Sequence, residues 1–196
     1  MSRFLETVRI QNGIPRNLSY HDRRVRRTLG HFHAGGSLNL ERLLLDAPQK
    51  GTFRARILYD RNQSSVSYHP YRLEKKTKLL TLTSDMDYTY KFAERKDLDA
   101  LAREAAHSGF DDALIIKSGL VTDTTIANIA FWDGKRWLTP DRPLLRGTLR
   151  QRLVDARWLH PVPIAVSDMA AFSHFALMNA LSGFYPAGPT TNITLN

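Results

Sequence analysis

The stretch VTDTTIANIAF, Val121–Phe131, decides how the fold of this chain is interpreted. It places one carboxylate, Asp123, at the end of a short predicted strand among small and polar residues, and a second strand follows from Asn128. A carboxylate that is buried without a partner loses its hydration and destabilises the folded protein. No nearby residue in the sequence supplies a cation, so we expect Asp123 to receive its partner from elsewhere.

The composition is typical of an ordinary soluble globular protein, with 196 residues, of which 42% are hydrophobic and 24% charged. This length allows one large domain or two small ones. The absence of cysteine excludes disulfides, thiolate metal sites and a cysteine nucleophile. The sequence has neither an apolar signal core at its N-terminus nor an apolar run that could span a membrane. We therefore expect a cytoplasmic protein.

The formal net charge of +9 is unevenly distributed. Residues 1–90 hold 16 Lys and Arg against 8 Asp and Glu, whereas residues 91–196 hold 12 against 11. Such an asymmetry predicts an anionic partner for the first half of the chain. The partner could equally be a small phosphate, a carboxylate substrate or a nucleic acid.

The first half of the chain is predicted to form a small antiparallel sheet with two helices. Apolar and polar residues alternate in 53–59 with the period of a half-buried strand. A helix is predicted over 21–32, with Ser19 as its candidate N-cap. The other predicted elements are a strand over 4–12 ending in a turn at Asn12-Gly13, a break at Gly35-Gly36, a helix over 38–45, an antiparallel strand through Val66 and Tyr68, and a strand over 78–83.

The second half mixes helices and strands without regular alternation, which favours an α+β fold over a doubly wound sheet. Residues 97–107 carry apolar side chains on one helical face. Asp133-Gly134 predicts a type I′ hairpin. The other predicted elements are strands over 113–117, 120–122, 127–132, 136–138 and 175–180 and helices over 148–156 and 167–172, followed by a loop-like tail. A domain boundary is expected near residues 85–95.

Three segments contain candidate functional residues. Lys91 is flanked by aromatic residues in YTYKF, and an apolar setting lowers the pKa of a lysine enough to make it a nucleophile. Alternatively, it is a surface lysine whose stem lies on aromatic rings. The segment HDRRVRR, 21–27, could bind phosphate, form a solvated basic face or contact nucleic acid. In RGTLR, 146–150, a helix start could bind an anion. The histidines lack metal-ligand spacing, so no metal site is predicted.

Five segments in order resemble the class IV aminotransferase family, whose members have fold type IV of the pyridoxal-phosphate enzymes. Leu5–Arg9 is similar to the opening strand of the family, and His21–Val25 to its H-x-x-R-L segment. Asp123–Asn128 is similar to the E-x-x-x-x-N segment, and Leu145–Arg150 to the G-(I/T)-x-R turn. Asn179-Ala180-Leu181 is similar to a segment of aminodeoxychorismate lyases. Each motif alone is weak evidence for the resemblance, but all five motifs in the order of the family are specific evidence for it.

The resemblance implies a two-domain α+β protein that binds pyridoxal 5′-phosphate between its domains and forms a homodimer. Residues 1–88 would form a small N-terminal α/β sandwich and residues 89–196 a C-terminal pseudo-barrel. Lys91 would be the Schiff-base lysine and general base, Arg24 a phosphate ligand, and Asp123 the partner of the pyridine nitrogen. The implied cofactor-binding set is Arg24, Lys91, Asp123, Asn128, Gly147, Thr148, Leu149, Asn179 and Ala180.

The resemblance leaves two reactions open. The NAL segment at 179–181 favours a lyase that eliminates pyruvate, and the alternative is a transaminase of the branched-chain or D-amino-acid type. In either case the excess positive charge of residues 1–90 suits a small, carboxylated amino-group substrate, with Arg9, Arg26 and Arg27 as candidate contacts. A basic nucleic-acid-binding module would explain the charge but would leave Asp123 and Lys91 without roles. We therefore expect neither a nucleic-acid partner nor a membrane.

The chain departs from the family pattern at two places. Asp123 stands where the family more often has glutamate, so the pyridine nitrogen would have to approach closer or bind through water. The segment Phe92–Lys96 replaces the tyrosine or asparagine that usually follows the lysine. Both departures concern the cofactor and substrate sites and not the predicted fold.

Overall fold

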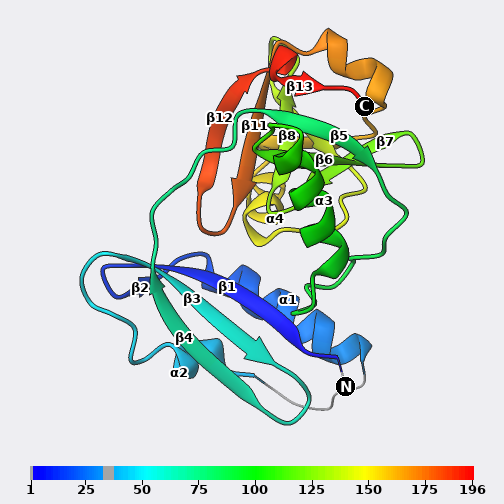
Figure 1. The fold of residues 1–196 in the computed structure, drawn as a ribbon. Helices are drawn as coiled ribbons and strands as arrows, with labels where there is room; N and C mark the ends of the chain where they lie inside the picture. Colours follow the sequence, from blue (N-terminus) through cyan, green and yellow to red (C-terminus); the bar gives the residue numbers. More distant parts are fainter. Residues whose placement is uncertain (1, 33–37) are drawn as a thin grey trace. The chain divides into compact units, whose positions relative to one another are not determined.

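A computed structural model describes residues 2–32 and 38–196 (Figure 1). The chain forms two compact units that do not follow a single cut in the sequence. Residues up to 73 form the first unit together with 90–94, and residues 74–89 form the second together with 95–196. The sequence predicts one boundary, at residues 88 and 89. The chain instead passes between the units three times, because residues 90–94 return to pair with the first strand.

The first unit is a four-stranded antiparallel sheet in the order β2-β1-β3-β4, accompanied by two helices. Both helices contribute apolar side chains to the same core as β1 and β3, including Val25, Leu29 and Leu40. The elements are β1 (Phe4–Gln11), β2 (Ile14–Pro15), α1 (Leu18–His31), α2 (Leu40–Leu43), β3 (Thr52–Tyr59) and β4 (Ser64–Pro70). The predicted antiparallel sheet with two helices is confirmed for this unit.

Alternation along β1 divides its side chains between two faces. Phe4, Val8 and Ile10 are buried in the core with the helices. Successive side chains of a strand point to opposite faces, so Thr7 and Arg9 belong to the other face, where they are half-exposed. Glu6 lies in the inward row among these apolar residues and is fully buried. A buried charge in such a row requires a partner from the helices.

Local turns agree with the sequence in some places and differ in others. The predicted turn after β1 is confirmed, since Asn12 and Gly13 have φ values of 49° and 78°, a region that Asn and Gly tolerate. The predicted N-cap at Ser19 is wrong, because α1 already begins at Leu18, after Asn17. The second helix is shorter than predicted. The predicted break at Gly35-Gly36 lies outside the described residues.

The second unit contains a nine-stranded mixed sheet. Its strands follow the order β10-β9-β8-β7-β6-β5-β13, and β11 pairs with both β8 and β12. Its elements are β5 (Leu79–Thr83), α3 (Lys96–His107), β6 (Asp112–Lys117), β7 (Leu120–Thr124), β8 (Asn128–Trp132), β9 (Trp137–Pro140), α4 (Thr148–Asp155), β10 (Leu159–Val162), the 3₁₀ helix η1 (Val166–Ala171), β11 (His174–Asn179), β12 (Gly183–Pro189), η2 (Thr190–Asn192) and β13 (Ile193–Thr194).

Two predictions about the second unit are wrong. The strand over 78–83 was expected in the first sheet, but β5 lies in the second unit, parallel to β6 and β13. Four of its five residues are buried, and such a continuous buried run does not identify its neighbours. The tail after residue 180 was expected to be loop, but it contains β12 and β13. Pro186 and Pro189 are tolerated in β12 because its described pairing is with β11 alone, which makes it an edge strand.

The hairpin between β8 and β9 also differs from the predicted type I′ turn. A type I′ turn needs a positive φ at both central residues, and in this loop only Gly134, at 96°, has one among the described residues. The Asp133 carboxylate instead accepts hydrogen bonds from the backbone amides of Lys135 and Arg136, both at 2.8 Å. The carboxylate therefore organises a longer turn than the sequence predicts.

Candidate functional site

The first unit contains a buried cluster of Glu6, His21 and Arg24. Arg24 donates from Nε to Glu6 Oε1 at 2.7 Å and from Nη2 to Glu6 Oε2 at 2.6 Å. His21 Nδ1 lies 2.5 Å from Glu6 Oε2. Glu6 and His21 are 0% exposed and Arg24 is 7% exposed. The forked pair fixes the plane of the guanidinium, and its remaining nitrogen, Nη1, takes no part in this pair.

The cluster results from two periodicities. Glu6 occupies the inward row of β1, and His21 and Arg24 are three residues apart on the buried face of α1. Burial opposes ionisation of Glu6, but the charge of Arg24 and the hydrogen bonds from His21 and Arg24 outweigh it, so the pKa of Glu6 falls to about 2. Burial also lowers the pKa of His21 against the opposing effect of Glu6, which favours a neutral imidazole.

Lys91 lies beside the first strand of the same unit. Leu5 N donates to Lys91 O at 2.9 Å, and Phe4 pairs with Phe92 in an antiparallel bridge. Tyr90 and Phe92, which flank the lysine in sequence, pack against the core of this unit. The aromatic environment of the lysine side chain itself stays a prediction. The charge of Lys91 also contributes to the lowered pKa of His21, which places the lysine within electrostatic reach of the Glu6 cluster.

The second unit buries Asp123 at the end of β7, as the sequence predicts. Its Oδ1 accepts from Asn128 Nδ2 at 2.6 Å and its Oδ2 from Leu145 N at 2.9 Å, with 4% of the residue exposed. Burial raises the pKa of Asp123 to about 6, although hydrogen bonds from Leu145 and Asn128 and the charge of Arg150 oppose this change. No ion pair to Asp123 occurs within residues 2–32 and 38–196. The carboxylate therefore has donors but no cation in direct contact.

Asn128 connects this carboxylate to the beginning of α4. Its Nδ2 also donates to Leu145 O at 2.9 Å. A Cβ atom added to Gly147 would lie 2.0 Å from Asn128 Oδ1, so only glycine fits at this position. Gly147 is the N-cap of α4, and Thr148 and Leu149 form the first turn of that helix. Backbone N–H groups in a first helical turn have no acceptor within the helix and can bind an anion.

The turn between β7 and β8 is held from several sides. Thr124 Oγ1 accepts from Ala127 N at 3.1 Å, and Asp112 Oδ1 accepts from Thr125 Oγ1 at 2.6 Å. Asn179 Nδ2 donates to Ile126 O at 3.3 Å, and Asn179 Oδ1 accepts from the amides of Leu181 and Ser182 at 2.9 and 2.8 Å. The NAL segment, with Ala180 at its centre, is thereby joined to the turn that follows Asp123.

The structure thus groups the predicted site residues into two sets. Asp123, Asn128, Gly147, Thr148 and Leu149 form a connected set in the second unit, with Asn179 and Ala180 joined to it through the turn at Ile126. Arg24 and Lys91 belong to the first unit. Their binding roles stay predictions.

Sequence reasoning gave no role to Glu6, His21 or Arg150. Glu6 could have been found from the alternation of β1, because it is a charged residue in an apolar row. Arg150 is 4% exposed and donates to Thr139 Oγ1 and Pro140 O at 3.3 and 2.7 Å. The positive charge of Arg150 lowers the pKa of Asp123, although the two residues do not form an ion pair. Their proximity depends on tertiary packing, which no local sequence pattern predicts.

Comparison with known proteins identifies the family. The sequence model described as Amino-transferase class IV matches residues 3–188. The chain belongs to the class IV aminotransferases. Its mixed α+β architecture is that of the fold type IV enzymes, as the resemblance predicted.

Several proteins resemble this class IV aminotransferase. An uncharacterised protein of Haemophilus influenzae is 31% identical over 184 residues, which cover 91% of this chain and 97% of that protein. A crystal structure from Haemophilus somnus, provisionally named a 4-amino-4-deoxychorismate lyase, is 29% identical with a TM-score of 0.84, covering 93% of this chain and 98% of the other. The pyridoxal-phosphate form of a hypothetical aminotransferase from Mycobacterium tuberculosis has a TM-score of 0.82 at 17% identity, covering 100% and 81%, and shows the fold alone.

The residues present in this class IV aminotransferase fit the cofactor of the family, which is pyridoxal phosphate. The buried Asp123 has hydrogen-bond donors and a raised pKa, so a protonated ring nitrogen would supply the cation that it lacks. The glycine at 147 brings the first turn of α4 against Asn128, which is itself bonded to Asp123.

Within the described residues, none of the helices has the length and apolar character to span a membrane.

Proposed function

We propose that this class IV aminotransferase binds pyridoxal 5′-phosphate and acts at the Cα of a small carboxylated amine, releasing pyruvate as an aminodeoxychorismate-lyase-like enzyme. The observation that carries the proposal is the buried Asp123, which has two hydrogen-bond donors and no cation in contact among the described residues. A buried carboxylate without a cation in contact destabilises the protein that has no ligand bound. A cationic ligand would explain why the fold keeps a carboxylate at this position.

Each residue then has a chemical task. Lys91 would hold the cofactor covalently through its amine and, once displaced by the substrate amine, would take the proton from Cα as general base. Asp123 would keep the pyridine nitrogen protonated. When bound, the cofactor supplies an electron sink for the electron pair left at Cα. Asn128 would hold the Asp123 carboxylate in place through its 2.6 Å hydrogen bond.

The phosphate would be held at its unreactive end, which positions the reactive end. Arg24 would contribute its guanidinium, whose plane is set by Glu6. Gly147, Thr148 and Leu149 would contribute the first turn of α4, where backbone N–H groups and the helix dipole favour an anion. Asn179 and Ala180 would contribute through the segment joined to Ile126.

The choice of reaction rests on the NAL segment at 179–181 and on the relative from Haemophilus somnus, whose provisional name is a lyase. The second candidate is transamination of a branched-chain or D-amino acid, and the family description, which names amino transfer, favours transamination.

We also expect a homodimer, which size-exclusion chromatography with light scattering would measure.

The test begins with purified protein supplied with pyridoxal phosphate. We expect an absorbance band near the visible edge that borohydride abolishes and that Lys91→Ala lacks. Lys50→Ala, which changes an exposed lysine of the same unit, is the matched control and should keep the band. Pyruvate release without keto-acid amination would support the lyase, and the reverse result would support the transaminase. No band, together with tight salt-dependent binding of nucleic acid, would refute the enzyme proposal.

A further inference from the structure

The second unit buries another carboxylate, Asp112, to which the proposed function gives no role. It is the first residue of β6 and is 2% exposed. Its Oδ1 accepts from Thr125 Oγ1 at 2.6 Å and from the backbone amide of Ala113 at 2.9 Å. Its Oδ2 is buried and has no hydrogen-bond partner among the described residues. One oxygen of this carboxylate is therefore desolvated without compensation, which is unfavourable for the fold.

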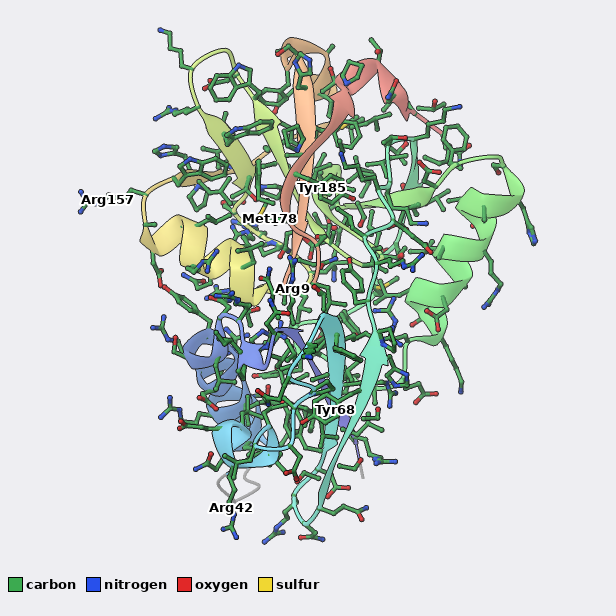
Figure 2. The ribbon with its side chains drawn as sticks, turned by 90° about the vertical axis from the view of Figure 1, so that its left-hand side faces the viewer. Arg9, Arg42, Tyr68, Arg157, Met178 and Tyr185 are labelled. Carbon is green, nitrogen blue, oxygen red and sulfur yellow. The ribbon has the colours of Figure 1, made fainter. Side chains whose placement is uncertain are left out.

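Asp112 occupies a row of otherwise apolar side chains. Alternation along β6 puts it on the same face as Leu114 and Ile116, and β5 places Leu79 directly opposite it. These apolar residues belong to the core that also contains Tyr185, which Figure 2 labels. Burial raises the pKa of Asp112 and that of Tyr185, and the charge of Asp112 adds to the second effect. An apolar side chain would suit this row better than a carboxylate, so packing alone does not explain Asp112.

Asp112 and Asp123 lie on opposite faces of the sheet. Asp123 pairs with Asn128, and Asn128 pairs with Met178, so these three side chains share one face. Met178 packs there in a core shared with α4, whereas Tyr185 lies in the core on the side of Asp112, and Figure 2 labels both residues. The side chain of Asp112 therefore does not point towards Asp123. An effect of one carboxylate on the other must pass through the backbone that connects the two faces.

That backbone is the turn formed by residues 124–127, and Asp112 holds its second residue. The side chain of Thr125 donates to Asp112, and its carbonyl oxygen accepts from Arg95 Nη2 at 3.0 Å, so the same residue is held from two sides. Ile126, the one large apolar side chain of the turn, is 48% exposed, and its burial contributes little to holding the turn. Polar contacts therefore determine where this turn lies.

A displacement of the turn would reach Asp123 directly. Asn128 Nδ2 donates to Asp123 Oδ1 at 2.6 Å, and the four residues of the turn are all that separates the two in sequence. A hydrogen bond to a charged acceptor is short and strong, so the contact between Thr125 and Asp112 is suited to fixing the turn. A displacement of about 1 Å in a catalytic group can slow a reaction on the order of 100-fold.

We propose that Asp112 is a positioning residue for Asp123, and that it acts through the Thr125 hydroxyl to hold the Asp123–Asn128 pair where it meets the ring nitrogen of the cofactor. This inference rests on the proposed function, because it takes that nitrogen as the partner of Asp123. It gives a task to a carboxylate that the apolar core does not require. The role needs an oxygen acceptor at position 112 and a hydroxyl at position 125, and each can be removed separately.

The binding test compares pyridoxal phosphate with its deaza analogue, in which a C–H group replaces the ring nitrogen, by equilibrium dialysis with the cofactor-free protein. Asp123 can serve the first ligand but not the second. T125V removes the hydroxyl, and we expect about tenfold weaker binding of pyridoxal phosphate and less than about twofold weaker binding of the analogue. D112A should show the same selectivity, and the double variant should add little, because both substitutions remove one hydrogen bond. T125S keeps the hydroxyl and should bind both ligands as the wild type does.

T122V is the matched control. Thr122 is also buried, on β7 next to Asp123, but its Oγ1 donates to Ile115 O at 2.8 Å and not to the turn or its supports. Each of T122V and T125V loses one buried hydroxyl hydrogen bond, so we expect the unfolding temperature to fall by about 2–4 °C in both. T122V should nevertheless bind both ligands within about twofold of the wild type. A merely structural role of Thr125 predicts that the two variants behave alike.

A second measurement needs no cofactor. The side-chain amide of Asn128 donates to Asp123 Oδ1 and to Leu145 O, so its protons are protected from exchange with solvent. If Asp112 holds the pair through the turn, T125V and D112A should speed this exchange about tenfold, and T122V should leave it unchanged. Nuclear magnetic resonance of the cofactor-free protein would measure the exchange rates.

The outcomes separate the two proposals. Equal weakening of both ligands in T125V, or no weakening of either, would overturn the positioning role and leave the proposed function standing. Selective weakening in T125V but not in D112A would also overturn it, because Thr125 would then act without Asp112. If the wild type lacks the borohydride-sensitive band while T125V and D112A still speed the Asn128 exchange, the proposed function is refuted and the action of Asp112 on the Asp123–Asn128 pair is supported.

Discussion

Two buried carboxylates of this class IV aminotransferase, Glu6 in the first unit and Asp123 in the second, differ in what surrounds them. Glu6 has Arg24 and His21 in direct contact, and its pKa falls to about 2. Asp123 has hydrogen-bond donors from Asn128 and Leu145 but no ion pair in the described chain, and its pKa rises to about 6. The fold itself neutralises the first carboxylate. The second is arranged for a cation that the protein does not supply, which distinguishes a structural charge from a candidate binding group.

The largest effect is expected from removing the second carboxylate. Asp123→Ala should still form the borohydride-sensitive absorbance band but slow the reaction at Cα on the order of 10³-fold, because nothing would keep the ring nitrogen protonated. Asp123→Glu should be milder. Single-turnover kinetics would measure the loss. If both variants reacted at the wild-type rate, the distinction between the two carboxylates would fail.

Removing the first carboxylate should act on stability. Glu6→Gln leaves the charge of Arg24 buried without its partner, so we expect the free energy of unfolding to fall by about 3–5 kcal/mol. Urea denaturation at pH 7 would measure it. Glu41→Gln, at an exposed position of α2, is the matched control and should change stability by less than about 0.5 kcal/mol. A silent Glu6→Gln would show that the buried pair contributes no net stability.

The two carboxylates should respond to pH in opposite directions. The pKa of Glu6 is lowered to about 2 from 4.5, so its stabilisation is complete above pH 4.5 and is lost as the pH falls towards 2. The pKa of Asp123 is raised to about 6 from 3.8, so its ionisation destabilises the cofactor-free protein as the pH rises from 3.8 to about 6. Each contribution is on the order of 3 kcal/mol.

Asp123→Asn tests the second of these contributions. In the protein without cofactor it should raise the free energy of unfolding at pH 7 and remove the decline between pH 4 and 6. Urea unfolding across pH 3–8 would show this. A decline of the same size in the variant would assign that pH dependence to other groups.

The smallest effect is expected at Gly147. Gly147→Ala places a methyl group 2.0 Å from Asn128 Oδ1, so Asn128 must move away from Asp123. We expect about a tenfold weaker affinity for pyridoxal phosphate and about 1–3 kcal/mol of lost stability. Equilibrium dialysis and urea denaturation measure the two quantities. Gly109→Ala, at a glycine with nothing within 4 Å of the added Cβ, controls for the substitution itself, although its φ of 82° adds backbone strain.

Sequence patterns predicted the parts of the fold that depend on local chemistry. The turn at Asn12-Gly13, the alternating strand β3 and the amphipathic helix α3 were confirmed because their signals lie within a few residues. The destination of β5 and the strand β12 were not predicted, since partner choice and edge position are properties of the assembled sheet.

The same limit applies to the site. The strand pattern predicts that Asp123 lies at the end of one strand and that Asn128 begins the next, and the structure confirms both positions. Asp123 is also buried, as expected. The pairing of Glu6 with Arg24 joins residues 18 positions apart on different elements. Sequence spacing does not predict which residue on the inward face of a strand will contact which residue of a helix, because that contact depends on how the two elements pack.

The return of residues 90–94 to the first strand has a consequence for how this protein can be cut or truncated. Ala93 N bonds to Arg3 O and Leu5 N bonds to Lys91 O, so these residues complete the edge of β1. A fragment ending at residue 88 would expose that edge to pairing with other chains. During synthesis, β1 cannot complete its pairing until Ala93 has left the ribosome. A nick at residue 89 would leave the units joined through 73–74 but would separate the lysine from the strand that precedes it.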